Sequence, residues 1–208
     1  MFFKIIMKIR YVYRLLFTSI IYRQFFRSLG KHTLIESPLK IMNEKNIDIG
    51  YNVTIEKYVT LYSVEQYNRK MYAGKIKIGN NVYMNNNCNI TAANSIIIHD
   101  NVVMAFNVSC FDFNHNYEDL ETPVKYSDLS VLGEIIISEN CWIGMNVSII
   151  GNVHLGKNCI VGANSVVTKS FPENTVIAGI PAKIIKKYDA KRKIWKRVDT
   201  KGDYTNEI

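Results

Sequence analysis

Aliphatic residues recur every six positions through the second half of the chain. The run is Ile137, Ile143, Ile149, Leu155, Val161 and Val167. Four places after each of the first five stands a small or modest residue: Cys141, Val147, Val153, Cys159 and Ser165. An amphipathic helix repeats about every 3.6 residues and a strand about every 2, so neither explains this period. A six-residue repeat is typical of a parallel β-helix, in which each hexad forms one face of a coil.

The same spacing extends upstream, through the sets that begin at Ile49, Ile78 and Ile98. Asparagine recurs just before the i+4 position, for example at Asn52, Asn81, Asn101, Asn140 and Asn152. Because asparagine tolerates left-handed backbone angles, these positions predict sharp corners between the faces.

Two segments break the repeat. Residues 62–75 contain three tyrosines and fit a loop, and residues 111–134 form a longer excursion that is polar, aromatic and rich in carboxylates. Loops held on rigid scaffolds carry function more often than the scaffold does. The excursion 111–134 is therefore the first place to look for chemistry.

The pattern predicts a parallel β-helix over residues 36–185, flanked by a basic helical segment with its connector (1–35) and a basic tail (186–208). Within these parts we expect residues 30–46 to be a connector and the regular repeat to begin near Ile47. The stretch from Lys186 to Lys201 suggests a short helix that includes Ile194 and Trp195.

An apolar stripe marks the N-terminal segment and predicts a helix of roughly twenty residues. It comprises Phe2, Ile6, Ile9, Tyr13, Leu16 and Ile20. Basic residues (Lys4, Lys8, Arg10 and Arg14) lie away from it. Two interpretations stay open: the helix packs on the solenoid or on a neighbouring subunit, or residues 1–30 form an interfacial helix that contacts an anionic membrane.

Charge and cysteine usage narrow the class of protein. The formal net charge of +8 is concentrated at the two ends of the chain, and residues 1–35 contain seven Lys/Arg and no acid. No nucleic-acid-binding motif accompanies these basic ends, so we expect no nucleic-acid partner.

The four cysteines occupy inward hexad positions, where they act as small apolar fillers. With no CxxC pair, no export signal and no transmembrane run, we expect a cytoplasmic protein, at the inner membrane face if the first helix binds lipid.

Three ordered motifs carry a specific resemblance: Cys141-Trp-Ile-Gly-Met-Asn-Val, Val161-Gly-Ala-Asn-Ser-Val-Val-Thr-Lys169 and Ala178-Gly-Ile-Pro-Ala-Lys183. Over roughly residues 47–186 the chain resembles the hexapeptide-repeat acyltransferases. It is most similar to the sugar O-acetyltransferase branch, which includes galactoside and maltose acetyltransferases and enzymes of capsule and O-antigen clusters. The resemblance implies a left-handed coil and a homotrimer with acetyl-CoA in clefts between subunits. It also implies direct attack of an acceptor hydroxyl on the thioester.

The resemblance also assigns roles to particular residues. His115 matches the catalytic base, and Asn85 matches the asparagine that positions the acceptor. The remaining matches are to the coenzyme site: Trp142, Gly144, Ala163, Thr168, Lys169, Lys183 and Lys186. Four of them also have a plainer interpretation: His115 can be an ordinary surface histidine, Trp142 can cover a subunit contact, and Lys183 and Lys186 can simply be solvated.

The sequence departs from the branch at three places. Met145 replaces a small polar residue, so one coenzyme contact must come from backbone. Lysines stand at 183 and 186 where arginine is common, and lysine lacks the bidentate fork that arginine offers to a phosphate. Ala93 replaces an acid that binds the acceptor in the galactoside branch. We therefore expect an acceptor other than a simple galactoside or maltose.

The expected chemistry needs one base. A sugar hydroxyl is little ionised at neutral pH, whereas an imidazole with a pKa near ~6.5 can accept its proton as the new bond forms. The alternatives are N-acetylation of an amino sugar or xenobiotic, and a solenoid scaffold without catalysis. No two histidines lie within ten positions of each other, so a three-histidine zinc site of the carbonic anhydrase type is not expected, nor is any other metal.

Overall fold

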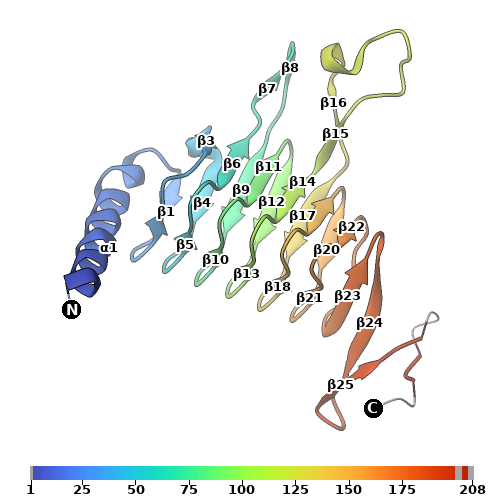
Figure 1. Ribbon diagram of the computed structural model, residues 1–208. Helices are drawn as coiled ribbons and strands as arrows, with labels where there is room; N and C mark the ends of the chain where they lie inside the picture. Colours follow the sequence, from blue (N-terminus) through green and yellow to red (C-terminus); the bar gives the residue numbers. More distant parts are fainter. Residues whose placement is uncertain (1, 200–202, 206–208) are drawn as a thin grey trace.

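The computed structural model describes residues 2–199 and 203–205, and it consists mostly of short strands that stack in three parallel sheets (Figure 1). Sheet A contains β1 (Ser28–Leu29), β4 (Ile47–Ile49), β9 (Lys75–Ile78), β12 (Ser95–Ile98), β17 (Glu134–Ile137) and β20 (Val153–Leu155). Sheet B contains β2 (Leu34–Ile35), β5 (Thr54–Ile55), β10 (Tyr83–Met84), β13 (Val103–Met104), β18 (Trp142–Ile143), β21 (Ile160–Val161), β23 (Thr175–Gly179), β24 (Ala182–Asp189) and β25 (Ile194–Arg197). Sheet C contains β3 (Lys40–Met42), β6 (Thr60–Ser63), β11 (Asn89–Ala92), β14 (Ser109–Phe111), β19 (Ser148–Ile150) and β22 (Val166–Val167).

The chain visits sheets A, B and C in turn and then repeats, so each circuit is one coil and each hexad supplies one face. The parallel register aligns equivalent positions: Ile98 pairs with Ile137, and Ile137 pairs with Leu155. The predicted inward positions form one continuous core, and Ile137, Ile143, Ile149 and Leu155 are fully buried. The six-residue repeat therefore predicted the sheet-forming segments correctly.

Asparagines in the left-handed conformation form two of the three corners in most coils, although His32, Ser37 and Tyr58 take the positive φ at corners of the first two coils. At the corner from sheet A to sheet B, each side-chain amide donates a hydrogen bond to the side-chain oxygen of the next. The ladder joins Asn52, Asn81, Asn101, Asn140, Asn158 and Asn174, at 2.8–3.2 Å. A second ladder, at the corner from sheet B to sheet C, joins Asn107, Asn146 and Asn164. Asn152 is an exception, because its neighbour Gly151 takes the positive φ of 98° there.

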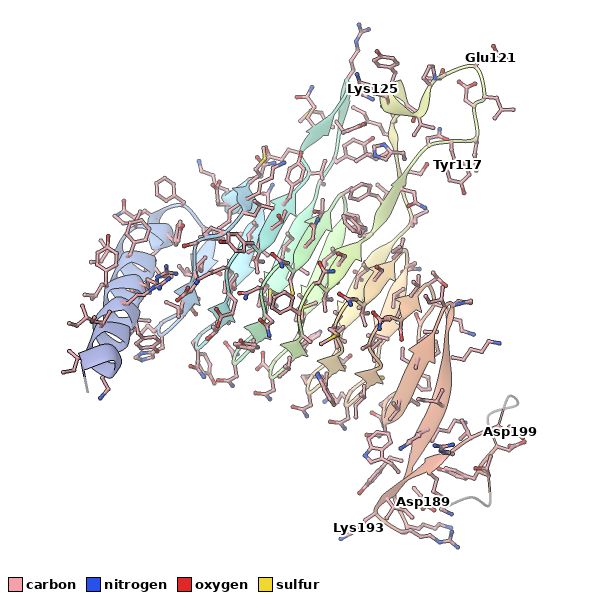
Figure 2. The ribbon with its side chains drawn as sticks, viewed as in Figure 1. Tyr117, Glu121, Lys125, Asp189, Lys193 and Asp199 are labelled. Atoms are coloured by element: carbon pink, nitrogen blue, oxygen red, sulfur yellow. The ribbon has the colours of Figure 1, made fainter. Side chains whose placement is uncertain are left out.

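Both long interruptions leave at the third corner, where the chain passes from sheet C to sheet A; we call this the hairpin edge. The first carries the hairpin β7 (Gln66–Tyr67) and β8 (Lys70–Met71). The second carries β15 (Phe113–His115) and β16 (Leu129–Val131), also antiparallel. The two hairpins project in the same direction from the stack (Figure 1), and the tip of the second is marked by Tyr117, Glu121 and Lys125 (Figure 2).

The N-terminal region contains the expected helix, α1 (Phe2–Ile20), followed by a 3-10 turn, η1 (Tyr22–Gln24). The expected connector over residues 30–46 is instead part of the coil, because β2 and β3 extend sheets B and C, and only the 3-10 turn η2 (Glu44–Asn46) interrupts them. The sheets thus begin at Ser28. Leu29, Ile35 and Ile41 already show the six-residue spacing, which was the available signal.

The short C-terminal helix predicted around Ile194 and Trp195 is wrong. β24 turns back antiparallel on β23, and β25 pairs antiparallel with β24, so the basic segment extends sheet B as strands. The physical reason is that β23 would otherwise leave a row of unpaired backbone groups at the end of the sheet. Residues 200–202 and 206–208 of the expected tail lie outside the described residues.

Candidate active site

The base of the excursion 111–134 is fixed by one buried carboxylate. Asp112 directly follows β14 and is completely buried. Its Oδ1 accepts a hydrogen bond from the Ala93 N–H at 2.7 Å, and its Oδ2 accepts from the N–H groups of Asn94 and Ser95 at 2.9 and 2.7 Å. Burial raises the pKa of the Asp112 carboxyl, and the three N–H donors oppose that rise. The carboxylate thereby attaches the excursion to the corner of the preceding coil.

His115 lies at the end of β15, where it pairs with Leu129 of β16, and its side chain is exposed. The ring of Tyr67 meets the imidazole edge-on, with ring centroids 5.3 Å apart and an interplanar angle of 64°. Tyr67 belongs to β7, so a residue of the first hairpin limits the orientation of a residue on the second.

Further contacts join the two hairpins into one unit. The Tyr72 hydroxyl accepts a hydrogen bond from the Leu129 N–H at 2.8 Å, and the Asn68 side-chain amide donates to the Ser127 carbonyl at 2.8 Å. Beneath them Val64, Ala93 and Leu129 form a small separate core. His115 therefore presents an exposed imidazole on a hairpin that the other hairpin holds in place.

Thr168 and Lys169 lie at the same edge, directly after β22, and both are exposed. The Lys169 ammonium is 5.6 Å from the centroid of the Phe171 ring, which faces it from the start of the next coil. His115, Thr168 and Lys169 constitute the hairpin-edge group.

The other predicted coenzyme residues lie on sheet B. Trp142 is 55% exposed and stands in one row of the register with Ile160, Val176 and Lys186. Lys183, on β24, is exposed as well.

Gly144 and Ala163 occupy adjacent rungs just beyond this row, where the coils turn towards sheet C. A Cβ atom at Gly144 would lie 2.7 Å from both the Ala163 nitrogen and the Val161 carbonyl oxygen. Glycine is therefore required there by close backbone packing, and the exposed Met145 follows it.

Asn85 follows β10 at the corner from sheet B to sheet C and is half-buried. Its side-chain oxygen accepts a hydrogen bond from the Asn86 N–H at 2.8 Å. Together with Trp142, Gly144, Ala163, Lys183 and Lys186 it makes up the sheet B group. Sheet C separates this group from the hairpin-edge group, so the predicted residues of one chain form two clusters and not one.

The structure adds two residues that the sequence analysis did not single out, Tyr67 and Asp112. The signal for Tyr67 was the tyrosine-rich break at 62–75, whereas nothing in the sequence marks Asp112 as buried. Ala93 is also informative, because it is buried under Leu129 and donates to Asp112, so an acid at this position would have no room in the present packing.

The other histidines lie elsewhere. His154 is exposed on sheet A, 3.0 Å from the Ser138 hydroxyl through its Nε2, at the rim of a cavity of about 530 Å³. His99 follows β12, and His32 lies between β1 and β2. Within the described residues, no group of three His, Cys, Asp or Glu side chains is placed to hold a metal ion.

Comparison with known proteins identifies the family. Residues 134–169 match the model of the bacterial transferase hexapeptide repeat, six repeats in length. WbbJ of Escherichia coli K12, assigned as a lipopolysaccharide biosynthesis O-acetyl transferase, is 33% identical over 88% of this chain and 92% of its own. The chain belongs to the hexapeptide-repeat acyltransferases. The galactoside O-acetyltransferase of the same organism is 32% identical over 76% of this chain and 72% of its own length.

Solved structures of other acyltransferases superpose on this one. A maltose O-acetyltransferase from Clostridium difficile is 31% identical over 82% of this chain and 74% of its own, with a TM-score of 0.55. AntD, an N-acyltransferase from Bacillus cereus crystallised with dTDP and coenzyme A, has a TM-score of 0.68 over 84% of this chain and 91% of its own. At 23% identity, AntD supports the shared fold alone.

Proposed function

We propose that this acyltransferase is an acetyl-CoA-dependent O-acetyltransferase that acts on a sugar hydroxyl in the synthesis of a cell-surface polysaccharide such as capsule or O-antigen. The observation that carries the proposal is the placement of His115: it is exposed, flanked by Tyr67, and held on a hairpin whose base Asp112 fixes. The named relatives, which include lipopolysaccharide, galactoside and maltose O-acetyltransferases, support the acetyl group and the class of acceptor.

In this proposal His115 is the general base. One ring nitrogen accepts the proton of the acceptor hydroxyl while the hydroxyl oxygen bonds to the thioester carbonyl carbon. The carbon–sulfur bond then breaks, and the proton leaves with the departing sulfur as the thiol. A positioned base of this kind typically contributes on the order of 10²–10⁴ in rate. Asn85 contributes a side-chain amide that orients the acceptor.

The remaining residues fit acetyl-CoA by their chemistry. Trp142 offers an exposed aromatic surface, and the exposed Ala163 lies on the adjacent rung, packed against the buried Gly144. Lys169, Lys183 and Lys186 provide cations for the phosphate groups, and Thr168 a hydroxyl. Met145 brings no polar group, so one contact would come from backbone.

The separation of the two residue groups supports a homotrimer. If the coil is left-handed, as in the family, neighbouring subunits related by a threefold axis can bring the hairpin-edge group of one chain against the sheet B group of the next. Each site would then be built from two chains, with His115 and Asn85 on different subunits. We place this enzyme in the cytoplasm, where acetyl-CoA is available.

The experiment that tests the proposal measures thiol release from acetyl-CoA with a panel of sugars, nucleotide sugars and amino sugars. We expect turnover with hydroxyl acceptors and a loss of about 10²-fold or more in His115→Ala. His154→Ala serves as the matched control, since His154 is exposed on another face. Turnover restricted to amines would replace O-acetylation by N-acetylation, and absence of both turnover and coenzyme binding would support a scaffold.

A further inference from the structure

Helix α1 turns apolar side chains to solvent and polar side chains to the solenoid, which is the reverse of a helix that packs on its own protein. At about 100° per residue, eight of its exposed apolar side chains fall within an arc of about 140°, whereas the exposed Tyr11 lies outside it. They are Ile5, Ile6, Ile9, Val12, Tyr13, Leu16, Phe17 and Ile20. Ile9, Leu16 and Ile20 are 63%, 54% and 58% exposed. We call this surface the α1 apolar face; the side chains of Phe2 and Lys4 lie outside the described residues.

The opposite side of α1 makes the contacts with the solenoid, and these contacts are largely polar. Thr18 is buried, and its hydroxyl accepts a hydrogen bond from the Ile35 N–H at 3.2 Å. Arg14 forms an ion pair with Glu36 on the same side. The helix lies at the end of the stack, beside β1 (Figure 1). The solenoid therefore holds α1 mainly by its polar side. At one margin of the α1 apolar face Phe17 packs against Tyr22, and the rest of the face, with Ile9, Leu16 and Ile20, is exposed.

Positive charge borders this face. Lys8 and Arg10 fall on its two margins, because their helical positions lie just outside the apolar arc on either side. Beside the helix, a cavity of about 320 Å³ is lined by Leu16 of the apolar face and by three basic residues: Arg23, Lys31 and His32. Within the described part of the chain, Lys8, Arg10, Arg23 and Lys31 form no ion pair. No acidic residue occurs before Glu36.

We infer that α1 docks this enzyme on the surface of an anionic phospholipid bilayer. An apolar face bordered by cations is the pattern of a helix that lies in the plane of the interface, with its apolar residues among the acyl chains and its cations at the phosphates. The basic cavity beside Leu16 offers a place for a phosphate-bearing headgroup. No helix of the described residues has the length and apolarity needed to span a membrane, so the contact is peripheral.

Charge decides between a bilayer and a second copy of α1. Two copies placed face to face would bring the basic margins of one helix against those of the other, and like charges repel. An anionic leaflet instead attracts each Lys or Arg near its surface. The inference does not depend on the acetyl-transfer proposal.

The test is co-sedimentation of the full-length protein with vesicles. We expect it to pellet with vesicles of equal parts phosphatidylglycerol and phosphatidylcholine, to stay in solution with phosphatidylcholine alone, and to be released by high salt. The double variant Ile9→Glu/Leu16→Glu, changed at exposed positions, should lower binding by about tenfold or more. Lys8→Gln/Arg10→Gln should lower it on the order of tenfold.

The matched control is Leu120→Glu/Val124→Glu, which adds the same charge at exposed positions on the excursion tip, far from α1 (Figure 2). It should bind like the wild type, and thermal melting should confirm that all variants fold. Wild-type protein that stays in solution with both vesicles, or an Ile9→Glu/Leu16→Glu variant that pellets fully, would overturn the inference. A change in oligomeric state in that variant without any vesicle binding would assign the face to a second copy instead.

Discussion

The imidazole of His115 and the ring of Tyr67 meet edge-on at a centroid distance of 5.3 Å, although 48 positions separate them in the chain. The contact exists because the two hairpins leave the same corner two coils apart and pack on each other. The orientation of the proposed base thus depends on a segment that makes no other contribution to the predicted site.

Tyr67→Ala should lower kcat without changing the fold. An aromatic pair contributes roughly 1 kcal/mol, so a loss of about five- to tenfold is expected when the imidazole is no longer oriented. Steady-state kinetics with a hydroxyl acceptor give the measurement. Tyr67→Phe keeps the ring and should retain nearly full kcat; equal losses in both variants would mean that the hydroxyl, and not the ring contact, matters.

Asp112→Asn should destabilise the protein by about 2–4 kcal/mol, because an amide cannot accept from all three N–H groups and at least one donor becomes unsatisfied in a buried position. Denaturant unfolding measures the change. Asp128→Asn, an exposed carboxylate on the same excursion, is the control and should change stability by less than about 0.5 kcal/mol. A stable Asp112→Asn protein would show that the excursion is held by its hairpin contacts alone.

Mixing His115→Ala and Asn85→Ala chains should restore activity if each site uses His115 of one subunit and Asn85 of the next. If the two chains assemble at random into a ring, about a quarter of the sites combine the wild-type His115 of one chain with the wild-type Asn85 of the next. Subunits are exchanged by joint refolding, and thiol release is then measured. A mixture no more active than the two parents would place both residues in one subunit's site or outside any site.

Lys186→Ala should raise the KM for acetyl-CoA by about three- to tenfold and leave kcat nearly unchanged, because it removes a cation from the row that contains Trp142. The difference should shrink at high salt, since exposed charges are screened. Lys193→Ala, at the β24–β25 turn (Figure 2), removes an equal charge away from that row and should leave KM unaltered.

The four cysteines should resist Ellman's reagent at pH 8 in the folded protein, because all are buried. Burial raises the pKa of Cys88 to about 11, so its thiolate forms only as the pH rises through that value; burial raises the pKa of Cys110 too. A hydrogen bond from Cys141 lowers the pKa of the Cys159 thiol. Cys159 should therefore react first at low denaturant. A fast-reacting thiol without denaturant would contradict this expectation.

Sequence and structure agree where the repeat alone determines the result. The period of six predicted the inward residues and most corners, because each hexad must turn at the same place to stay in register with its neighbours. The path after Ala178 could not be predicted in this way, since β24 forms to cover the end of a sheet and Ile194 follows no hexad. The direction of the α1 apolar face was equally hidden, because it depends on which side of the helix meets β2.

The site was predicted only in part for a similar reason. His115 and Lys169 could be placed at one edge by counting hexads, but the brace from Tyr67 and the burial of Asp112 arise from contacts between separate excursions. Whether Asn85 serves His115 of its own chain or of another also depends on assembly, which no single chain encodes locally.

The asparagine ladders bear on how this protein can change during evolution. An inserted residue at either laddered corner would displace one amide from its stack and break hydrogen bonds to the coils above and below. The remaining corner carries no such ladder among the described residues, and both hairpins emerge there. New specificity can therefore be gained by lengthening the chain at that corner while the prism beneath it stays intact.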